Sequence, residues 1–351
     1  MTVVVTGASG SIGTALLERL GGDVVGVARR VPDETAPPYA RARWVRCDLA
    51  APTADALLRE VFAGARAVVH LAWAVQPDRH DRPMRDTNLD GTARVLRAVA
   101  DAGVPQVVCA SSVAAYAPGP RTRRVGEAWP VTGVPGSAYS AQKAALESVL
   151  DAFTAEHPTI AVARIRPCGV LQPASAAQLR RWTLGPLLPA RLLGRRLLPV
   201  PLWHGLRAQA VHADDVAAAI TALLDRGLAG AFNLAAEPVL DARDLARILG
   251  GGLLPVPLPV LRALTWAAWR TGLVPLHPGW LRLADQAPVV DTARAAELLG
   301  WRPEHDTRAV LRQFVAALAH DGSAPSAPLR GGAGRLGPLE PTHQSQGREA
   351  R

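Results

Sequence analysis

The chain has little cysteine and lacks several common catalytic signatures. Its three cysteines, Cys47, Cys109 and Cys168, are widely spaced and form no CxxC pair. A disulfide framework or a cysteine zinc site is therefore not expected, and a reducing cytoplasm fits best. No HExxH, GxSxG or GxxxxGK[ST] pattern occurs, which argues against a zinc protease, a serine hydrolase of the nucleophile-elbow type and a P-loop NTPase.

Negative charge is also in short supply. The chain has 30 acidic and 39 basic residues, for a formal net charge of +9, and arginine dominates over lysine. Such a balance can signal nucleic acid or an anionic membrane surface. Because the arginines are scattered along the chain, we expect no nucleic-acid partner. A solvated basic surface, with a few arginines facing a phosphate-bearing ligand, explains the charge equally well.

No uninterrupted apolar stretch reaches the length of a membrane span. Hydrophobic residues make up 49% of the chain, which is enough for a sizeable core. Prolines and arginines interrupt the most apolar region, residues 253–283, and the N-terminus shows no basic-then-apolar leader. We expect a cytoplasmic protein without an integral membrane span. Peripheral membrane contact through residues 253–283, or coverage of an apolar ligand by them, stays open.

Strand-like and helix-like segments alternate through the first half of the chain. Helical spacing of apolar residues is found at 12–20, 88–102 and 140–156. Short, nearly all-apolar strands separated by helices are typical of a parallel sheet covered on both faces. With right-handed crossovers they predict an α/β fold with a doubly wound parallel sheet, the Rossmann fold. The predicted strands are residues 2–6, 24–28, 44–47, 67–71, 106–110 and 160–165.

Beyond Pro167 the alternation becomes irregular, and proline and leucine become more frequent. We expect a Rossmann domain over residues 1–170. Residues 171–321 then form a smaller C-terminal substrate-binding region mixed with late Rossmann elements, among them a helix near 211–224 and a strand near 232–235. Residues 322–351, rich in Gly, Pro, Ser and Gln, are predicted to be a disordered tail.

A glycine-rich turn lies directly between the first predicted strand and its helix. Gly7 permits a tight turn, Gly10 lets the backbone approach a pyrophosphate without a Cβ in the way, and Gly13 allows the helix to pack closely on the strand. The helix N-terminus offers free N–H groups to phosphates. In this context the turn predicts a dinucleotide site that also includes Ser9, Ser11 and Ile12, although a purely structural turn is the alternative.

The end of the second strand selects between NAD and NADP. An acidic residue there would bind the ribose 2′-hydroxyl of NAD, whereas arginine would accommodate a 2′-phosphate. The chain has Ala28, Arg29 and Arg30 at this point, which favours NADP unless both arginines are exposed loop charges. Asp48, just after the third strand, would accept a hydrogen bond from the adenine amino group or cap the turn that follows it.

Three residues have the pattern of a proton-transfer site. Ser112 lies just past the fifth strand, and Tyr139 and Lys143 are four residues apart on one helical face. A nearby ammonium lowers the pKa of a phenol from about 10, so that Tyr139 can exchange a proton with a substrate oxygen as hydride moves to or from nicotinamide. Ser112 would bind the same oxygen, and Lys143 the nicotinamide ribose. Asn88 would bridge or shape the site, or cap its helix.

Together these motifs resemble the extended short-chain dehydrogenase/reductases of the NAD-dependent epimerase/dehydratase family. The resemblance spans residues 1–318 and implies Ser-Tyr-Lys catalysis by Ser112, Tyr139 and Lys143 on a Rossmann core with NAD(P). Members of this family often pair through two long helices, and helices 88–102 and 140–156 are the candidates for such a homodimer interface, although the sequence does not decide the oligomeric state. The matching segments are TGASGSIG (6–13), DL (48–49), HLAW (70–73), Asn88, SSVAAY (111–116), YSAQK (139–143), RIRP (164–167), VHADDVAAA (211–219) and DTARAAELLGW (291–301).

The resemblance also extends the cofactor site and narrows the reaction. It implies that Leu49, Leu71, Ala72 and Pro167 line the cofactor path. Related dehydratases typically carry an acidic pair directly after the serine or threonine. The chain has Val113 and Ala114 there, which argues against dehydration.

The substrate is less clear from the sequence. Arginines at 180, 181, 191, 195 and 196 could clamp a sugar-nucleotide pyrophosphate, whereas the many leucines of the same segment favour an apolar cleft, a membrane-facing surface or a plain core. Trp266, Trp269 and Trp280 would stack on a ring or pack. The histidines are isolated from one another in the sequence, so we expect no metal site.

These sequence patterns leave three alternative functions. The first is an epimerase or ketoreductase of a sugar nucleotide or related carbohydrate. The second is a reductase or dehydrogenase of a hydrophobic alcohol or ketone, similar to hydroxysteroid dehydrogenases. The third is a non-catalytic NADP-binding sensor.

Overall fold

Parallel strands form the central sheet of the protein, in the order β11-β6-β5-β4-β1-β2-β3. The computed structural model describes residues 2–75, 82–120, 122–183, 199–274, 276–319 and 323–330. Each neighbouring pair in the sheet runs parallel, which confirms the predicted doubly wound α/β fold. The strands are β1 (Val3–Thr6), β2 (Val24–Ala28), β3 (Arg43–Arg46), β4 (Ala67–His70), β5 (Gln106–Ala110), β6 (Ala161–Pro167) and β11 (Gly230–Leu234).

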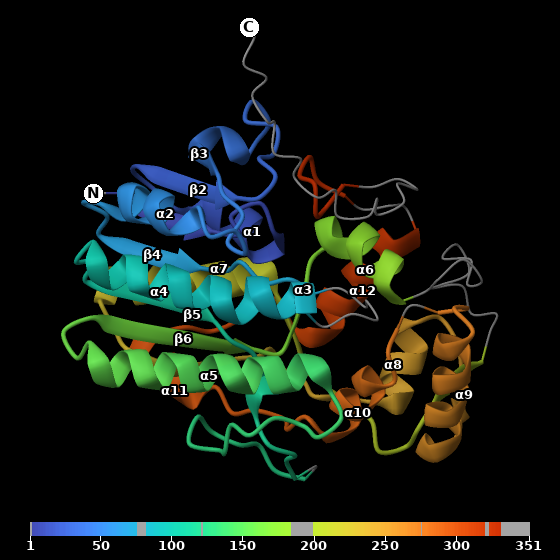
Figure 1. The fold of residues 1–351 in the computed structure, drawn as a ribbon. Coiled ribbons are helices and arrows are strands. Elements are labelled where there is room, and N and C mark those ends of the chain that lie inside the picture. The colour runs from blue at the N-terminus through green and yellow to red at the C-terminus, as the bar shows by residue number, and fades with distance from the viewer. Residues whose placement is uncertain are drawn as a thin grey trace, which may run out of the picture.

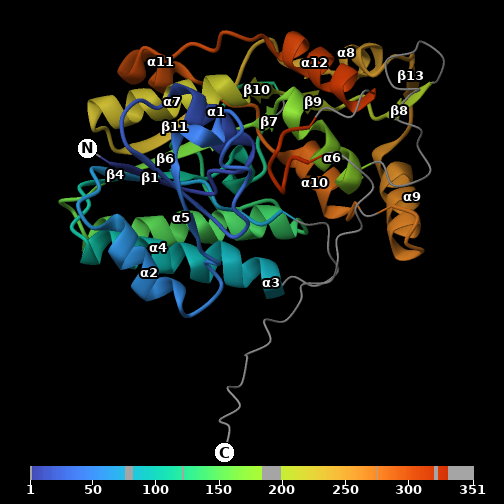
Figure 2. The same ribbon diagram turned by 90° about the horizontal axis from the view of Figure 1, so that it is seen from above.

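Helices cover both faces of this sheet (Figures 1 and 2). One face carries α1 (Ser11–Arg19), α7 (Ala213–Arg226) and α11 (Ala293–Leu299), and the other carries α2 (Ala54–Phe62), α4 (Gly91–Asp101) and α5 (Ala138–Glu156). The inner strands are largely apolar because both of their faces are buried, whereas Arg43 and Arg46 of the edge strand β3 are exposed. In β1, Val3 and Val5 belong to one core cluster and Val4 to the other.

The strand order reverses at β1, which lies between β2 and β4. In an open parallel sheet, such a reversal leaves a crevice at the carboxyl ends of the strands, where ligands bind. The chain enters this edge at Gly7 after β1, at Leu71 after β4 and at Ser111 after β5. The topology therefore brings the glycine turn and the predicted catalytic serine to one edge of the sheet.

The elements after residue 170 divide between the sheet and a smaller cluster beside it (Figure 1). β11 and α7 return to the sheet, and β7 (Gly169–Leu171) pairs with β10 (Ala210–His212). β9 (Arg207–Ala208) pairs with β12 (Leu240–Asp241), and β8 (Val200–Leu202) pairs with β13 (Leu253–Pro255). The domain boundaries themselves stay predictions. The remaining helices are α3 (Arg82–Arg85), α6 (Ala176–Thr183), α8 (Ala242–Ile248), α9 (Leu258–Arg270), α10 (Gly279–Gln286) and α12 (Thr307–Ala319). No described helix is long and apolar enough to cross a membrane.

The first residues of the predicted disordered tail pack against the Rossmann domain. Residues 323–330 are described, and within them Ser326 and Leu329 are fully buried. The Ser326 hydroxyl donates a hydrogen bond of 2.9 Å to the carbonyl oxygen of Ser9 in the glycine turn. Burial of the Leu329 side chain and this hydrogen bond hold the segment against the Rossmann domain, despite its polar and proline-rich composition. Residues 322 and 331–351 of the predicted tail lie outside the described residues.

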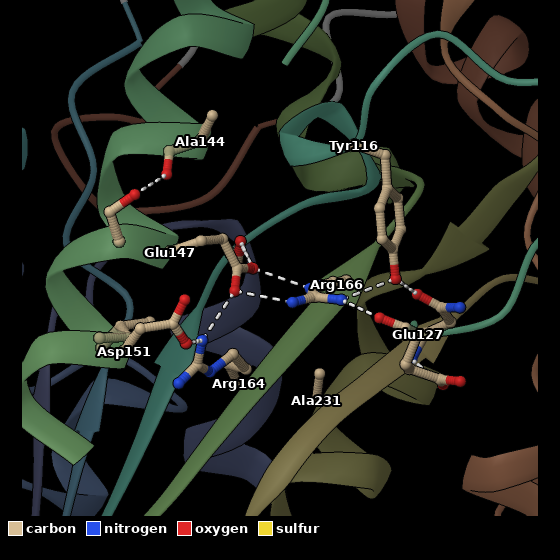
Figure 3. A network of polar contacts seen from close by, with 12 residues as sticks. Tyr116, Glu127, Ala144, Glu147, Asp151, Arg164, Arg166 and Ala231 are labelled. Atoms are coloured by element: carbon tan, nitrogen blue, oxygen red, sulfur yellow. Dashed lines mark hydrogen bonds and ion pairs between the residues drawn. The ribbon is translucent and has the colours of Figure 1, made fainter. Parts of the chain in front are cut away.

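A buried ion network joins α5 to the sheet (Figure 3). Glu147 of α5 is fully buried and accepts hydrogen bonds from Arg166 Nε and Nη2, both at 2.8 Å, and from Arg164 Nη1 at 3.1 Å. Ser111 Oγ donates to the same carboxylate. Arg166 Nη1 also donates to the Tyr116 hydroxyl at 2.9 Å. The network therefore connects α5 to β6 and to the residue that precedes Ser112.

The charge on Glu147 depends on these partners. Burial acts to raise the pKa of its carboxyl group, but the hydrogen bonds and charge of Arg166, with those of Ser111 and Arg164, outweigh burial and leave the pKa below its usual value. Glu147 is therefore a carboxylate at neutral pH, and it is the shared counter-ion of two buried guanidinium groups.

Glu147→Gln preserves the size of the side chain but removes this counter-ion. Breaking a buried ion pair from one side costs ~3–5 kcal/mol, because the remaining charge is left uncompensated. We expect a loss of that order in the free energy of unfolding measured by urea denaturation. The control is Asp151→Asn, since Asp151 also pairs with Arg164 but its side chain is 64% exposed. Its expected loss is below ~1 kcal/mol. Equal losses in the two variants would contradict the role given to Glu147.

Candidate active site

The glycine turn has the shape of a phosphate cradle. Gly7 has φ +73°, and a Cβ there would lie 2.6 Å from the backbone N of Ala72. A Cβ at Gly13 would lie 2.5 Å from the carbonyl oxygen of Ala8, so α1 can pack on the turn only with glycine at this position. A Cβ at Gly10 would meet only the Gly7 oxygen, at 3.2 Å, which leaves open space beside the backbone.

The N-terminus of α1 is available for a ligand. Its cap residue, Gly10, has no side chain that could accept from the first N–H groups of the helix. Those groups and the positive end of the helix dipole therefore face the open side of the turn. The residues present fit the pyrophosphate of a dinucleotide.

Two residues that sequence reasoning missed also bind the turn. Gln172 Nε2 donates to both the carbonyl oxygen and the hydroxyl of Ser11, each at 3.0 Å. Ser326 binds the Ser9 carbonyl from the C-terminal segment. These contacts join residues that are 161 and 317 positions apart. No local motif could have revealed them.

Ser112 lies where the sequence placed it, immediately after β5. It caps the 3₁₀ turn Val113–Ala115, with its Oγ accepting from the N–H of Ala114 at 3.1 Å. The same hydroxyl donates to the carbonyl oxygen of Pro167 at 3.4 Å. The Tyr139 phenol lies near the same hydroxyl, close enough for Ser112 to lower the pKa of the phenol. The structure therefore brings Ser112, Tyr139 and the end of β6 together at the carboxyl edge of the sheet.

The phenol of Tyr139 differs from the sequence-based expectation. Its ring stacks on the indole of Trp280, with centroids 4.9 Å apart. Burial raises the pKa of Tyr139, and the nearby Ser112 hydroxyl lowers it only in part. The expected lowering of this pKa by the Lys143 ammonium is therefore not found. The reason is desolvation of the phenol, which favours its neutral form.

Lys143 is the chain's only lysine among 39 basic residues. Its side chain is buried, and Nζ donates to the carbonyl oxygen of Ala110 at 2.9 Å. Burial lowers its pKa from 10.5 to about 7, although the nearby charge of Glu147 acts to raise it. Arginine could not replace it in this respect, because a guanidinium stays charged throughout the physiological range.

Trp73 lies directly against this amine, with its ring centroid 3.4 Å from Lys143 Nζ. Within the part of the chain that the structure describes, Trp73 Nε1 is the one buried side-chain polar atom with no hydrogen-bond partner. A buried donor without an acceptor carries a desolvation penalty of about 1–3 kcal/mol. An acceptor on a bound ligand would remove that penalty. Trp73 is part of the HLAW motif, but no sequence pattern indicated a function for it.

Asn88 bridges two parts of the site. It is buried within a π-helical turn, Asp86–Asp90, rather than at a helix start, so the helix-cap alternative is wrong. Its carboxamide accepts from Ala74 N at 2.7 Å, and Nδ2 donates to Ala74 O at 3.0 Å and to Gln142 Oε1 at 2.7 Å. Both amide hydrogens are occupied, so Asn88 holds the segment after β4 against α5.

The other predicted cofactor residues lie around the same edge. Arg29 is exposed after β2, and Leu49 is buried. Asp48 Oδ1 accepts from the N–H of Ala50 at 3.1 Å, so it caps the local turn. Leu71 and Ala72 follow β4, and Ala72 closes over Gly7.

The predicted substrate arginines cannot be placed as a set. Arg180 is on α6, whereas the side chain of Arg181 and residues 191, 195 and 196 lie outside the described residues, as do the leucines of 184–198. Of the predicted tryptophans, Trp280 packs on Tyr139, Trp269 contacts the His277 ring at 4.8 Å, and Trp266 is 53% exposed. The described residues contain no cluster of His, Cys, Asp and Glu that could hold a metal ion.

Comparison with known proteins identifies a family match. Residues 3–235 match the NAD dependent epimerase/dehydratase family. This segment begins in β1 and ends just after β11, so it includes the glycine turn, Ser112, Tyr139 and Lys143.

Curated relatives are distant. An uncharacterized protein of Mycobacterium tuberculosis is 29% identical over 323 residues, which are 91% of this chain but only 30% of that protein. The chain thus spans less than a third of that relative's length. The UDP-glucose 4-epimerase of Mycolicibacterium smegmatis is 27% identical over 316 residues, covering 87% of this chain and 94% of the enzyme. A 4-hydroxy-2-methyl-3-oxo-4-farnesyl-3,4-dihydroquinoline-1-oxide ketoreductase of Stigmatella aurantiaca is 29% identical over 167 residues, 48% of this chain and 49% of that protein.

Solved structures share the fold. The dTDP-glucose 4,6-dehydratase DesIV of Streptomyces venezuelae, with NAD and TYD bound, superposes with a TM-score of 0.67 at 22% identity. The alignment covers 92% of this chain and 98% of that one. At this identity, the likeness shows a common architecture, including the smaller cluster beside the sheet.

The single lysine makes its protonation directly measurable. Protein produced with ¹³C-labelled lysine carries that label only at Lys143. We expect its Cε resonance in the folded protein to titrate near pH 7, as burial dictates. The same label in urea should titrate near the unperturbed value of about 10.4.

The sign of the linkage follows from this shift. The folded-state pKa lies below the unfolded one, so the unfolded chain binds the proton more tightly between pH 7 and about 10.4. The contribution of Lys143 to stability therefore increases as the pH rises through that window. A folded-state midpoint near 10.4 would mean that the amine is hydrated and would contradict the burial described above.

Proposed function

The chain belongs to the NAD-dependent epimerase/dehydratase family, and we propose that it catalyses hydride transfer on a sugar nucleotide or related carbohydrate with Ser112, Tyr139 and Lys143. The proposal rests on one arrangement above all. Lys143 contacts Trp73, which follows Ala72, and Ala72 packs on Gly7 of the glycine turn. Ser112 and Tyr139 lie at the same carboxyl edge of the sheet, where the strand order reverses. Epimerase and ketoreductase chemistry both need a hydroxyl acid/base and a nicotinamide at such a place.

Each residue has a distinct part in the proposed reaction. A bound nicotinamide supplies or accepts the hydride. Ser112 Oγ and the Tyr139 phenol bind the substrate oxygen that changes between hydroxyl and carbonyl. Because burial keeps Tyr139 protonated, its first step is to donate a proton to a carbonyl oxygen as reduction proceeds. Lys143 holds the nicotinamide ribose, and Trp73 Nε1 provides a further donor at the same place.

Dehydration is not part of the proposal. Removing water from a sugar requires a second acid beside the serine or threonine. Val113 and Ala114 occupy the positions directly after Ser112, and neither can transfer a proton.

We favour NADP over NAD as the cofactor. Arg29 and Arg30 directly follow β2, and the last residue of that strand is Ala28 rather than an acidic residue. Burial lowers the pKa of Arg30, and the positive charge of Arg29 lowers it further. Two guanidiniums that repel each other would be stabilised by a 2′-phosphate placed between them. NAD is the alternative, since DesIV is described with NAD bound.

Calorimetric titration with NADP and with NAD tests this preference. Arg29→Asp should weaken NADP binding by about tenfold or more, the loss expected for one charge-assisted hydrogen bond. It should leave NAD binding unchanged or stronger, because a carboxylate near the end of β2 can bind the ribose 2′-hydroxyl. Arg59→Asp, at an exposed position at the end of α2, makes the same change in net charge away from the turn. Tighter binding of NAD by the unaltered protein would overturn the preference for NADP.

A hydrophobic ketone or alcohol is the second candidate substrate. Trp280, Leu283 and Val134 form an apolar cluster against Tyr139, which suits an apolar substrate as well as a sugar ring. The ketoreductase of Stigmatella aurantiaca, named for a farnesylated ketone, is among the relatives. A non-catalytic sensor of NADP is the third, and activity measurements distinguish it from both.

Tyr139→Phe tests the catalytic assignment. Loss of the phenolic proton should reduce turnover by ~10²–10⁴-fold, the usual contribution of a general acid or base, with cofactor affinity little changed. Tyr39→Phe is the matched control, because Tyr39 is a buried tyrosine whose hydroxyl contacts Thr14 of α1. The substrates are UDP-sugars, dTDP-sugars and apolar ketones.

The outcomes separate the three functions. Turnover of sugar nucleotides supports the first candidate, and turnover of apolar ketones alone supports the second. Unimpaired turnover by Tyr139→Phe would refute the site. Cofactor binding without turnover of any substrate class would support the sensor.

A further inference from the structure

The helix α9, Leu258–Arg270, is apolar around its whole circumference yet contains no buried residue. Only Arg262, Thr265 and Arg270 among its 13 residues are polar or charged. A helix that is hydrophobic on every side is normally buried. Both views show α9 at the edge of the molecule, on the side away from α2 and α4 (Figures 1 and 2).

One side of α9 has partners within the protein. Leu258 and Leu261 pack against a cluster that includes Trp203, Leu206 and Leu281. Trp269 contacts the His277 ring. These contacts fix the rotation of the helix and determine which side faces outward.

The outward side of α9 is a largely apolar strip that also contains Arg270. At 100° per residue its members fall within a single arc of the helix. Val260 is 47%, Leu264 61% and Trp266 53% exposed, and the nearby Leu254 and Leu273 are 46% and 49% exposed. Arg270 lies over the Trp266 ring at 5.8 Å. The exposed residues of the arc are Val260, Ala263, Leu264, Trp266, Ala267 and Arg270.

The stretch of chain that contains this strip carries charge of one sign, although Asp285 of α10 binds Trp203 in the cluster against which α9 packs. No Asp or Glu occurs from Leu245 to Ala284, whereas arginine occurs at 247, 262, 270 and 282. A stretch of this length with arginine and no acidic residue is attracted to an anionic surface and repelled by a cationic one. Apolar side chains together with Trp and Arg are the composition of helices that lie in the interface of a bilayer.

We propose that α9 docks the protein on an anionic lipid surface, with the strip of Val260, Leu264 and Trp266 inserted among the acyl chains. The helix lies in the membrane plane, since it is too short to cross the bilayer. Arg262 and Arg270 face the lipid phosphates. A second copy of the chain is a poorer occupant. The strip offers on the order of a few hundred Å², whereas a specific interface buries about 800 Å² per partner.

Vesicle co-sedimentation tests the proposal with the full chain. The vesicles are phosphatidylcholine alone and phosphatidylcholine mixed with phosphatidylglycerol. We expect binding to the mixed vesicles to be at least about tenfold stronger. Leu264→Glu should weaken that binding by at least about tenfold, because a buried leucine is replaced by a charge that repels the surface.

Leu298→Glu is the matched control. Leu298 is 40% exposed and lies on α11, which packs on the sheet and is not part of the smaller cluster beside it. Both variants change the net charge equally, so a merely non-specific attraction of a basic protein would respond equally to each. The urea midpoint of each variant establishes that it is folded.

Several results would overturn the proposal. They are no sedimentation with either vesicle, equal binding to both vesicles, or equal effects of Leu264→Glu and Leu298→Glu. A dimer in light scattering that Leu264→Glu dissociates, without vesicle binding, would instead assign the strip to a second copy of the chain.

Discussion

The carboxylate of Glu147 is the interaction on which the site depends most. It neutralises Arg164 and Arg166 of β6, fixes Ser111 beside Ser112, and lies four residues after Lys143 on α5. Through Arg166 the same network reaches Tyr116, whose hydroxyl donates to Asn233 of β11 at 2.7 Å. One buried charge therefore sets the position of α5 relative to β5, β6 and β11, and α5 carries both Tyr139 and Lys143.

The site holds several groups in states that are unfavourable without a ligand. Lys143 is desolvated to a pKa of about 7, and the indole N–H of Trp73 is buried without an acceptor. Arg29 and Arg30 repel each other, and the N-terminus of α1 has no side-chain cap. Sites that are preorganised for a ligand commonly keep such groups at a cost in stability. A phosphate-bearing ligand with hydroxyl acceptors would satisfy all four.

Local sequence patterns predicted most of the fold. β2 and β5 have the predicted bounds, and the strands before β6 differ by at most a residue or so at their ends, because apolar runs between turn residues depend on neighbours in the chain. The left-handed backbone of Gly7 and the close packing of Gly13 on Ala8 were also predictable, since both are local, whereas the contact of Gly7 with Ala72 was not. Residue spacing also placed Tyr139 and Lys143 together at the start of α5.

Contacts across the fold were beyond such patterns. The stacking of Trp280 on Tyr139 and the bond from Ser326 to Ser9 join segments far apart in the chain. For the same reason the sign of the Tyr139 pKa shift was wrong, because helical spacing gives the distance to a charge but not the degree of burial. The placement of residues 323–330 depends on the buried Leu329 side chain and on the hydrogen bond from Ser326 to Ser9, and composition reveals neither.

A crystal structure of the protein with NADPH is the most direct test of the central claim, that the sheet edge binds a dinucleotide beside Ser112, Tyr139 and Lys143. The account predicts the pyrophosphate on the N–H groups at the start of α1 and the nicotinamide ribose between Lys143 and Trp73. It also predicts an acceptor within hydrogen-bond distance of Trp73 Nε1. A dinucleotide bound elsewhere, or bound here with its nicotinamide away from Tyr139, would contradict the account.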